Sequence, residues 1–517
     1  MKLDDTLYIT TPIYYVNDKP HLGHAYTSVA CDALARYMRL AGREVRFLTG
    51  TDEHGQKVEK SAEKAGIPPQ AFVDEVSEHF RDLALSLKLT NDDFIRTTED
   101  RHKHATQAIW KKLEEAGDIY LGSYSGWYSV RDEAFYAESE LIEGKAPTGA
   151  EVEWVEEPSY FFKLSEYQDR LLAFYEANPD FILPESRRNE VISFVKGGLK
   201  DLSISRTTFS WGVPVPSDEN HIMYVWLDAL TNYLTSIGYP DTESEDFQTF
   251  WPAMHMVGKD ILRFHAVYWP AFLMSANVEL PKRIFAHGWW TIEGEKMSKS
   301  LGNVVAPNHL IEKYGLDQTR YFLLREVPFG NDGNFSRQSL VDRINSDLAN
   351  NVGNLAQRTL TMIQKNCDAK VPTPHDEHLI DADKELMDLV RVTRSDTPEE
   401  MLERMLRCEF NQVIAEIIAM SSRANEYIDE QAPWKQKKEN PARMEAILYH
   451  LAEAIRCIAI MLQPFAPDAT KQLLDQLAVP EDQRSFAHLT PSFALEPGTP
   501  LPKPEPLFPR FQLEETA

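Results

Sequence analysis

The stretch that decides the fold is Tyr8-Ile-Thr-Thr-Pro-Ile-Tyr-Tyr-Val-Asn-Asp-Lys-Pro-His-Leu-Gly-His24. Its β-branched and aromatic start predicts a short strand, and Asn17, Asp18 and Pro20 predict a turn after it. Residues 25–40 contain no Pro or Gly and carry apolar side chains at helical spacing, so we expect a helix to begin at the two histidines. The unpaired N–H groups and positive dipole at such a helix start favour a phosphate.

Three residues at this helix start suit a nucleotide. Gly23 would let a flat purine approach the backbone, because no Cβ stands in the way. His21 and His24 could donate to charge that develops on a phosphoryl group. A capped core helix with two incidental histidines explains this short group equally well, so the rest of the chain has to decide.

The length and composition set broad limits. A chain of 517 residues predicts roughly three or four domains. Hydrophobic residues make up 43% and charged residues 26%, which is typical of a soluble globular protein. No apolar run approaches the roughly 18 residues of a membrane span, and the start lacks a basic head followed by an apolar run. We therefore expect neither a membrane partner nor a secretory signal.

The cysteines narrow the class of protein further, whereas the net charge does not. The net charge of −26 excludes little, because a large enzyme can carry a local basic track for nucleic acid on an acidic body. The four cysteines, at positions 31, 367, 408 and 457, are far apart in the sequence. That spacing argues against a disulfide framework and a cysteine zinc site, and it suits a reducing, cytoplasmic location.

Strands and helices alternate after the first helix. We predict a strand over 44–50 and helices over 56–65 and about 69–87, which favours a parallel sheet with ligands at the C-terminal strand ends. The loop Thr49–Gly55 lies at such an end. A plain loop and a binding loop both remain open for it.

The residue composition and the apolar periodicity of the sequence change twice along the chain. Between about 120 and 202 aromatic residues alternate with acids, Gly and Pro, which predicts an inserted, partly β subdomain. We expect parallel strands to resume at 203–210, 221–226 and 254–258, followed by a helix over 261–274. From about 336 the apolar periodicity predicts a helical bundle, and after about 490 a Pro-rich tail extends along the surface.

A second loop, Gly294–Gly302, places Lys296 and Lys299 between two glycines with small hydroxyl residues beside them. Two mobile ammonium groups suit a pyrophosphate leaving group, whose charge grows as it departs. A charged surface loop explains the lysines alone. Together with the His-x-Gly-His group, however, this loop favours nucleotide chemistry.

These two loops carry a resemblance to a known family. His21-Leu-Gly-His24 resembles the HIGH signature of class I aminoacyl-tRNA synthetases, with Leu for Ile, and Lys296-Met-Ser-Lys-Ser300 matches their KMSKS signature. Further stretches resemble methionyl-tRNA synthetases of the bacterial type, and the resemblance spans nearly the whole chain. These stretches are Thr11–Asn17, Thr49–Lys57, Tyr224–Leu230, Gly258–His265 and Gln431–Trp434.

The resemblance implies an α/β fold. A Rossmann-type parallel-sheet catalytic domain would carry an inserted connective subdomain, and an all-α helical-bundle anticodon-binding domain would follow. The implied boundaries are 1–118 and 203–283 for the two halves of the catalytic domain, 119–202 for the connective-peptide insertion, 284–335 for the KMSKS loop and stem-contact region, 336–490 for the anticodon-binding domain and 491–517 for the Pro-rich tail.

The resemblance also implies an activity. ATP, with Mg²⁺, and L-methionine would form methionyl-adenylate and pyrophosphate, and the methionyl group would pass to the 3′-terminal adenosine of tRNA(Met), for translation initiation and elongation. His21 and His24 would stabilise the α-phosphate, while Lys296 and Lys299 would neutralise the β- and γ-phosphates. These four residues are the implied catalytic set. The implied ATP site adds Gly23, Ser298 and Ser300.

For methionine the resemblance implies a pocket with aromatic walls, which suit a polarizable thioether. Tyr15 and His265 would address the sulfur and Asp52 the ammonium group. Without the resemblance the aromatic members would be ordinary core. The full implied set is Pro12, Ile13, Tyr15, Asp52, Trp226, Ala229, Leu230, Tyr233, Ile261, His265 and Trp269.

For tRNA the resemblance implies that Asn354, Arg358 and Trp434 read the CAU anticodon. Unpaired bases stack well on aromatic side chains. Four basic residues against two acids between 334 and 367 would supply a local basic track.

The chain departs from many relatives in two places. Ser129 and Asp132 stand where a zinc-knuckle cysteine pair would be, and no cysteine occurs between positions 31 and 367. Ser is a poor zinc ligand, so we expect no zinc. Aromatic packing by Trp127, Tyr128, Phe135 and Tyr136 would replace the knuckle. The chain also lacks an appended oligonucleotide-binding domain, which favours a monomer.

Alternatives remain at this point. The editing insertion of the branched-chain class I enzymes does not fit the roughly 80 residues available, and a cysteine enzyme would need a zinc-binding set. A catalytically silent RNA-binding relative need not keep both phosphate loops. A small-molecule nucleotidyltransferase would not need Asn354, Arg358 and Trp434.

Overall fold

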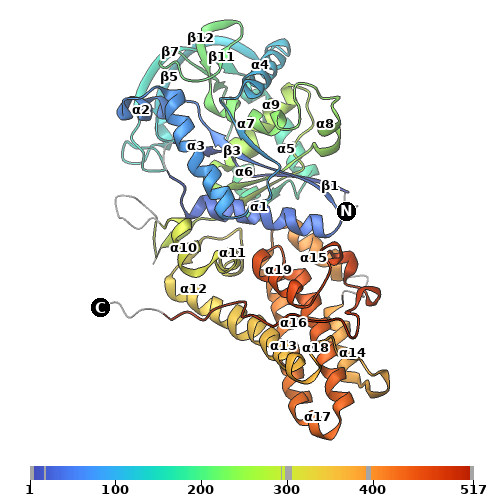
Figure 1. Cartoon of the computed structure of the whole chain (residues 1–517). Coiled ribbons are helices and arrows are strands. Elements are labelled where there is room, and N and C mark those ends of the chain that lie inside the picture. Colours follow the sequence, from blue (N-terminus) through green and yellow to red (C-terminus); the bar gives the residue numbers. More distant parts are fainter. Residues whose placement is uncertain (1–4, 17–18, 293, 297–304, 392–396, 513–517) are drawn as a thin grey trace, which may run out of the picture. The chain divides into compact units, whose positions relative to one another are not determined.

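The computed structural model describes residues 5–16, 19–292, 294–296, 305–391 and 397–512 (Figure 1). The chain forms two compact units. The first comprises the residues up to 31 and 45–287, and the second comprises 32–44 and 288–517. Among the helices described, none is long and apolar enough to cross a membrane.

A parallel sheet forms the centre of the first unit. Its order is β2-β3-β1-β13-β14-β8, with β4 also paired to β3. Because the chain moves from β1 to β3 on one side and to β13 on the other, a topological switch point lies at β1. The predicted Rossmann-type sheet is confirmed. The strands are β1 (Thr6–Thr10), β2 (Tyr14–Tyr15), β3 (Glu44–Asp52), β4 (Asp93–Arg96), β8 (Ile182–Leu183), β13 (Met254–Gly258) and β14 (Arg283–His287).

Helices connect these strands. The predicted helix after the first strand is α1 (Leu22–Leu40), and α2 (Gln56–Ala65) and α3 (Pro69–Ser86) follow as expected. The helix α4 (Asp100–Glu115) buries Ile109 and Trp110 in the main apolar core beside α7 (Val225–Thr235), and α8 (Glu245–Phe250) precedes β13.

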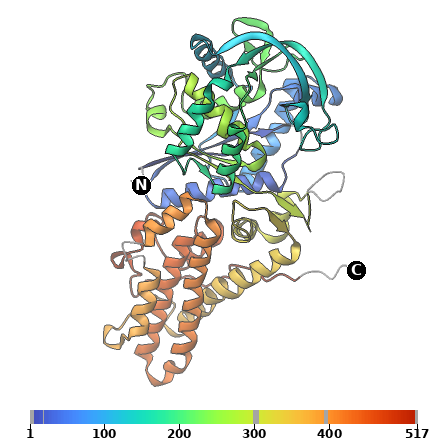
Figure 2. The same cartoon turned by 180° about the vertical axis from the view of Figure 1, so that it is seen from behind.

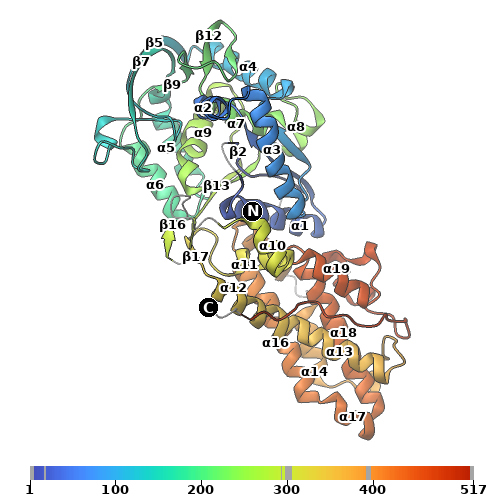
Figure 3. The ribbon, with the colours of Figure 1, turned by 60° about the vertical axis from the view of Figure 1, so that its left-hand side comes forward.

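The inserted subdomain is built on a long antiparallel ribbon. β5 (Ile119–Ser129) pairs with β7 (Glu153–Phe162), and Figures 2 and 3 show this ribbon curving away from the parallel sheet. β6 (Ala134–Tyr136) and β9 (Leu202–Ser203) extend it. The helices α5 (Gln168–Ala177) and α6 (Glu185–Lys196) follow, while β8 returns to the parallel sheet between them.

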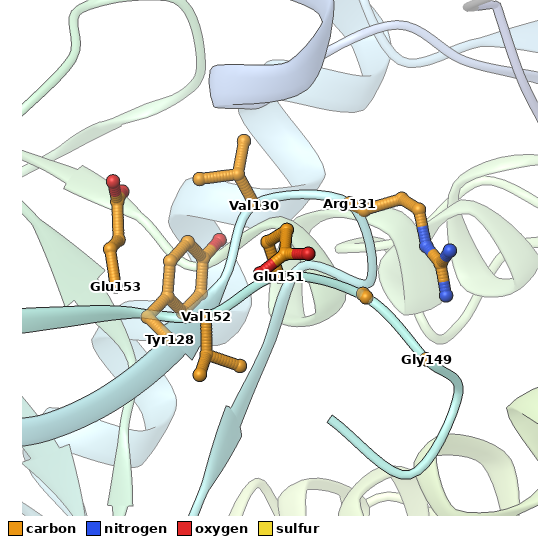
Figure 4. Close-up of a pocket in the computed structure, with 8 residues that line it drawn as sticks. Tyr128, Val130, Arg131, Gly149, Glu151, Val152 and Glu153 are labelled. Atoms are coloured by element: carbon orange, nitrogen blue, oxygen red, sulfur yellow. The ribbon is translucent and has the colours of Figure 1, made fainter. Parts of the chain in front are cut away.

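Hydrogen bonds add to aromatic packing at the expected knuckle position. Tyr128 packs on Phe135 with ring centroids 5.0 Å apart. Asp132 also accepts hydrogen bonds from the Thr148 and Tyr136 hydroxyls, and its own N–H donates to Ser129 Oγ. An open hollow lies beside this turn, as Figure 4 shows. Its lining residues are Tyr128, Val130, Arg131, Gly149, Ala150, Glu151, Val152 and Glu153.

Two of the three later strands were predicted wrongly. Residues 203–210 and 221–226 do not join the parallel sheet: β10 (Ser205–Arg206), β11 (Pro214–Val215) and β12 (Asp218–Met223) form a small antiparallel sheet, and α7 begins at Val225. Only 254–258, which is β13, was right. Short apolar runs look alike in parallel and antiparallel sheets, so the pattern alone could not separate them.

The predicted helix over 261–274 is interrupted. A short 3₁₀ turn, η3 (Lys259–Ile261), precedes a π-helical turn, η4 (Phe264–Tyr268), and α9 (Trp269–Ser275) completes it. Such π turns are frequent at functional sites.

The second unit is mainly helical, as predicted. The helix α18 (Pro441–Leu462) is buried around nearly its whole circumference and packs against α13, α14, α16, α17 and α19 (Figure 3). The other helices are α10 (Pro307–Tyr314), α11 (Leu316–Arg325), α12 (Arg337–Arg343), the π-helical η5 (Ile344–Gly353), α13 (Asn354–Asn366), α14 (Asp381–Val390), α15 (Thr397–Leu406), α16 (Phe410–Gln431), α17 (Pro433–Glu439) and α19 (Pro467–Gln476). The short strands β15 (Trp290–Ile292), β16 (Glu295–Lys296) and β17 (Gly333–Phe335) form a small sheet.

Polar contacts fasten this unit. Arg320 and Asp32 form a fully buried ion pair, with 2.6 Å between Nη2 and Oδ2. The Pro-rich tail is extended, and side-chain amides hold its backbone: Gln476 bonds both ways with Glu505, and Asn345 with Phe511.

Candidate active site

The site lies where the parallel strands of the first unit end. In an open α/β sheet, ligands bind outside the carboxyl ends of the strands, near the switch point. β3 ends at Asp52, and β2 places Tyr15 directly opposite it in the register of the sheet. The loop that follows β3 and the two residues of β2 therefore meet at this edge.

The end of β3 and the turn after it carry one open acid, Asp52, and two side chains that are engaged within the protein, Glu53 and His54. Glu53 is buried and pairs with Arg96, with 2.7 Å from Nε to Oε1 and 3.0 Å from Nη2 to Oε2. His54 Nδ1 lies 2.7 Å from Asp228 Oδ2, and the other oxygen of Asp228 lies 2.7 Å from His102 Nε2. These contacts anchor the loop to β4, α4 and α7.

The charge of Asp228 is stabilised within this network. Burial by itself raises the pKa of Asp228, but the adjacent His54 and His102 outweigh it and hold the pKa well below its ordinary value. Glu53 is thus engaged with Arg96 and His54 with Asp228, and Asp52 is the acid at this strand end that keeps an open carboxylate oxygen among the described residues.

Asp52 carries a buried carboxylate oxygen, Oδ1, that has no hydrogen-bond partner among the described residues. Burial, and then the carboxylates of Asp228, Glu133 and Glu53, raise the pKa of Asp52 well above its ordinary value. A buried, unpartnered carboxylate is costly unless a cation joins it. The ammonium group of an amino acid satisfies this requirement.

Other unpartnered polar atoms gather in the same unit. The Tyr15 hydroxyl and the indole N–H groups of Trp226 and Trp269 are buried and have no partner within the part of the chain that the structure describes. Trp226 stacks on Phe264 with ring centroids 3.8 Å apart and planes 7° apart. The Tyr15 hydroxyl matters most among these atoms, because Tyr15 is paired with Asp52 in the sheet and its hydroxyl is open to a ligand.

His265 is a neutral, fixed histidine. Its Nδ1 lies 3.0 Å from the carbonyl oxygen of Ile261, and its Nε2 lies 2.7 Å from the Tyr233 hydroxyl. Nδ1–H therefore donates to Ile261 and Nε2 accepts from Tyr233. Burial lowers the pKa of His265 to about 4. Both ring nitrogens of His265 are therefore engaged within the protein, whereas the Tyr15 hydroxyl is open among the described residues.

Most of the expected pocket residues lie in or against one large apolar cluster of the first unit. Ile13, Tyr15 and Ile261 pack against one apolar cluster, and Pro12, Ala229 and His265 are buried. The cluster itself contains Trp226, Leu230, Tyr233 and Trp269.

Sequence reasoning missed two aromatic members. Phe264 stacks on Trp226, and His255 lies 4.1 Å from the Tyr233 ring with its Nδ1 bonded to Thr10 Oγ1. Phe264 lies inside the stretch Gly258–His265 that carried the resemblance, so its neighbour His265 could have pointed to it. No signal in the sequence pointed to His255.

The two signature histidines form a defined pair at the start of α1. Their ring centroids are 3.9 Å apart. His24 Nδ1 accepts from the His21 N–H at 3.0 Å, and His21 Nδ1 accepts from the Gly23 N–H at 3.1 Å. In the neutral rings the proton is therefore on Nε2, which makes each Nε2–H a donor. A Cβ at Gly23 would lie 2.9 Å from the His21 ring, so a side chain here would displace that ring from this arrangement.

The structure describes only part of the second signature loop. β16 includes the backbone of Lys296, whereas Ser298, Lys299 and Ser300 lie outside the described residues. The same holds for Asn17 and Asp18 of the predicted turn.

The second unit presents the expected anticodon residues on α13 and α17. Trp434 is 45% exposed, which is unusual for so large an apolar ring, and the Arg358 guanidinium lies 5.7 Å from its centroid. Arg358 also pairs with Asp429, with 2.6 Å from Nη2 to Oδ1. Arg343 of the predicted basic track pairs with Glu326 and Asp347, so part of that track is neutralised locally. Asn354 is the first residue of α13.

The residues at the knuckle position do not fit a zinc ion. Asp132 is held by hydroxyl donors and Ser129 accepts a backbone N–H, and no group of three or more His, Cys, Asp or Glu among the described residues could hold a metal.

Comparison with known proteins agrees with this geometry. The family described as tRNA synthetases class I (M) matches residues 7–153 and 139–360, and the anticodon binding domain of methionyl tRNA ligase matches 373–517. The methionine–tRNA ligases of Rickettsia felis and Mesorhizobium japonicum are 59% and 56% identical, with 99% and 98% of this chain and 99% and 97% of theirs covered.

Solved structures extend the likeness to the fold. The Mycobacterium tuberculosis methionyl-tRNA synthetase in complex with methionyl-adenylate superposes with a TM-score of 0.94 at 52% identity, over 98% of this chain and 100% of that one. Its apo form gives 0.88 at 49% identity, over 98% and 99%. The chain belongs to the methionyl-tRNA synthetase family of class I aminoacyl-tRNA synthetases.

Proposed function

We propose that this chain activates L-methionine with ATP to methionyl-adenylate and pyrophosphate, and then transfers the methionyl group to the 3′-terminal adenosine of tRNA(Met). It serves translation initiation and elongation. The observation that carries the proposal is the open carboxylate oxygen of Asp52 beside the unpartnered Tyr15 hydroxyl, next to a cluster of aromatic side chains.

Methionine binds in the first unit. Asp52 takes its ammonium group, and the Tyr15 hydroxyl donates to the sulfur. Trp226, Tyr233 and Trp269 form the wall against the thioether chain. Tyr233 holds His265 as a neutral ring, so this histidine adds no positive charge beside the ammonium group. The apolar remainder of the pocket is Pro12, Ile13, Ala229, Leu230 and Ile261.

ATP enters as its Mg²⁺ complex at the start of α1. Gly23 leaves room at the backbone, and the Nε2–H groups of His21 and His24 donate to the α-phosphate as the methionine carboxylate attacks it. Lys296 and Lys299 neutralise the β- and γ-phosphates, with help from the hydroxyls of Ser298 and Ser300. This second assignment is supported by the resemblance of the loop to KMSKS. Catalysis is by positioning and charge stabilisation.

The tRNA anticodon is read in the second unit. The exposed Trp434 supplies a stacking platform, Arg358 a cation beside it, and Asn354 an amide on α13. The proposal includes a monomer that works in the cytoplasm. Its domain boundaries are those expected above for the catalytic halves, the insertion, the KMSKS region, the bundle and the tail.

ATP–pyrophosphate exchange with each of the twenty amino acids tests the proposal. We expect exchange with methionine alone, because a buried acid for the ammonium group stands beside aromatic and apolar side chains that suit a thioether. Exchange with a different amino acid would reassign the pocket, and no exchange at all would favour a catalytically silent RNA-binding role.

A further inference from the structure

Glu133 of the inserted subdomain adopts an unusual conformation. It has a φ of 49°, in the left-handed region that glycine prefers, yet its side chain is almost completely buried. A buried acid held in a sparsely populated backbone conformation is retained only where the surroundings determine it. Glu133 lies outside the pocket described above.

The surroundings of Glu133 are specific. The Tyr128 hydroxyl donates to its Oε2, and the Tyr224 hydroxyl donates to its carbonyl oxygen at 3.0 Å. Its Oε1 accepts the backbone N–H of Lys57 at 3.1 Å. The carboxylate therefore reaches from the insertion to the start of α2, which is 76 residues earlier in the chain.

The start of α2 has no cap of its own. Its N-cap residue is Gly55, which has no side chain to accept the first N–H groups. A carboxylate is favourable at a helix N-terminus, because it satisfies an open donor and meets the positive end of the dipole. A Cβ at Gly55 would lie 3.0 Å from Glu133 Oε1, so the glycine leaves room for this acid.

The same residues reach the amino-acid pocket. Lys57 Nζ donates to the Arg131 carbonyl oxygen at 3.2 Å and lies 5.1 Å from the centroid of the Tyr15 ring. Gly55 is three residues after Asp52. The insertion thus holds Lys57 at its backbone and at its ammonium group, close to the Tyr15 ring and just after the turn that follows Asp52.

We propose that Glu133 is a positioning residue for the amino group of the substrate. By capping α2 it holds the turn between Asp52 and α2, and so keeps the Asp52 carboxylate in the orientation that receives the ammonium group. The inserted subdomain is then part of the apparatus of amino-acid recognition, without touching the substrate. This inference rests on the proposed binding of methionine beside Asp52.

Three variants test the inference. Glu133→Gly suits the left-handed backbone and removes the cap, and Glu133→Gln keeps an oxygen that accepts from the Lys57 N–H. Glu143→Gly is the matched control, because Glu143 is exposed in the same subdomain and has a φ of 52°. Methionine KM and kcat are measured by ATP–pyrophosphate exchange. Binding of methionine and of 4-(methylthio)butanoate, which lacks the amino group, is measured by calorimetry.

We expect Glu133→Gly to raise the methionine KM roughly 5- to 10-fold with little change in kcat, since the loss of a cap is of this size. The Glu133→Gly variant should bind 4-(methylthio)butanoate as tightly as the unchanged protein does. The Glu133→Gln and Glu143→Gly variants should have nearly the same methionine KM and kcat as the unchanged protein.

Three results would overturn the inference: an unchanged KM in Glu133→Gly, equal weakening of both ligands, or a Gln variant as weak as the Gly variant. Failure of the unchanged protein to bind methionine would instead contradict the proposed function itself.

Discussion

Asp52 shows how one residue acquires a role from its neighbours. Three titratable side chains follow one another at the end of β3, and two of them are fully engaged, Glu53 with Arg96 and His54 with Asp228. Only Asp52 keeps a buried oxygen without a described partner. An unsatisfied carboxylate that costs stability in the free protein becomes binding energy when the ammonium group arrives.

Replacing Asp52 by Asn should raise the methionine KM about 100-fold, because removing one partner of a buried charge pair costs roughly 3 kcal/mol. The measurement is ATP–pyrophosphate exchange at varied methionine. Glu53→Gln provides the comparison: it breaks the pair with Arg96, so it should lower the Tm and leave the methionine KM within a few-fold. A normal KM in the Asp52→Asn variant would remove Asp52 from the pocket.

His265 makes stability depend on pH. Burial lowers its pKa to about 4, below the roughly 6.5 of an unfolded imidazole. Between these values the unfolded chain binds more protons, so the free energy of unfolding falls as the pH is lowered from about 6.5 towards 4, by about 3 kcal/mol from this residue. The contribution is fully present above pH 6.5.

Thermal unfolding followed from pH 7 to pH 4 checks this expectation. His265→Gln should lose part of the pH-dependent decrease, whereas replacement of the exposed His104 by Gln should not. Identical slopes for the His265→Gln variant and the unchanged protein would contradict the buried neutral histidine.

The turn between β5 and β6 is held by hydrogen bonds at the position where the resemblance had raised the question of a zinc knuckle. Asp132 accepts hydrogen bonds from the hydroxyls of Tyr136 and Thr148. Glu133 accepts hydrogen bonds from the Tyr128 hydroxyl and from a backbone N–H at the start of α2. Oxygen acceptors surrounded by hydroxyl and amide donors offer no vacant soft ligand to a metal.

We therefore expect purified protein to contain far less than one zinc per chain, measured by elemental analysis, and its Tm to be unaffected by a strong chelator. Asp132→Ala should lower the Tm by a few degrees, because it leaves several donors without acceptors. One equivalent of bound zinc, or unfolding by the chelator, would refute this view of the turn.

The loop Gly294–Gly302 is a second element with a testable role. Lys299→Ala should leave methionine binding intact and reduce adenylate formation about 100-fold, the scale of one lost charge-stabilising donor. Calorimetry gives the binding and ATP–pyrophosphate exchange the rate. A near-normal exchange rate would contradict the role proposed for this lysine.

At the level of the whole molecule, the residues proposed for the chemistry and those proposed for anticodon reading belong to two different compact units. The proposed methionine residues and the signature histidines lie in the first unit, and Trp434, Arg358 and Asn354 lie in the second. A change in one unit should therefore separate the two half-reactions.

Trp434→Ala should spare ATP–pyrophosphate exchange and reduce kcat/KM for tRNA charging by roughly 10- to 100-fold, since a base loses its stacking platform. Charging of a tRNA(Met) transcript and exchange are measured on the same preparation. Lys435→Ala, on the same helix, controls for a general loss of positive charge. Equal loss of exchange and charging would indicate misfolding of the variant instead.

Much of this architecture could be predicted from the sequence. The first strand, the helix that begins beside His21 and His24, and the helical second half follow from local pattern, because helical and strand periodicity acts over a few positions. The same local logic misassigned residues 203–210 and 221–226, since the pairing partner of a short strand is not encoded near it.

The tertiary structure decided how the site works. His54 meets Asp228 across 174 positions, Tyr233 fixes His265 across 32, and Glu133 reaches Lys57 across 76. Such contacts form only when distant segments are packed together, and they set the proton positions, the charge balance and the open oxygen of Asp52. The sequence by itself determined which residue types are present and in which local elements, while packing determined which of them remain free to bind, because a buried polar group is defined by its partners.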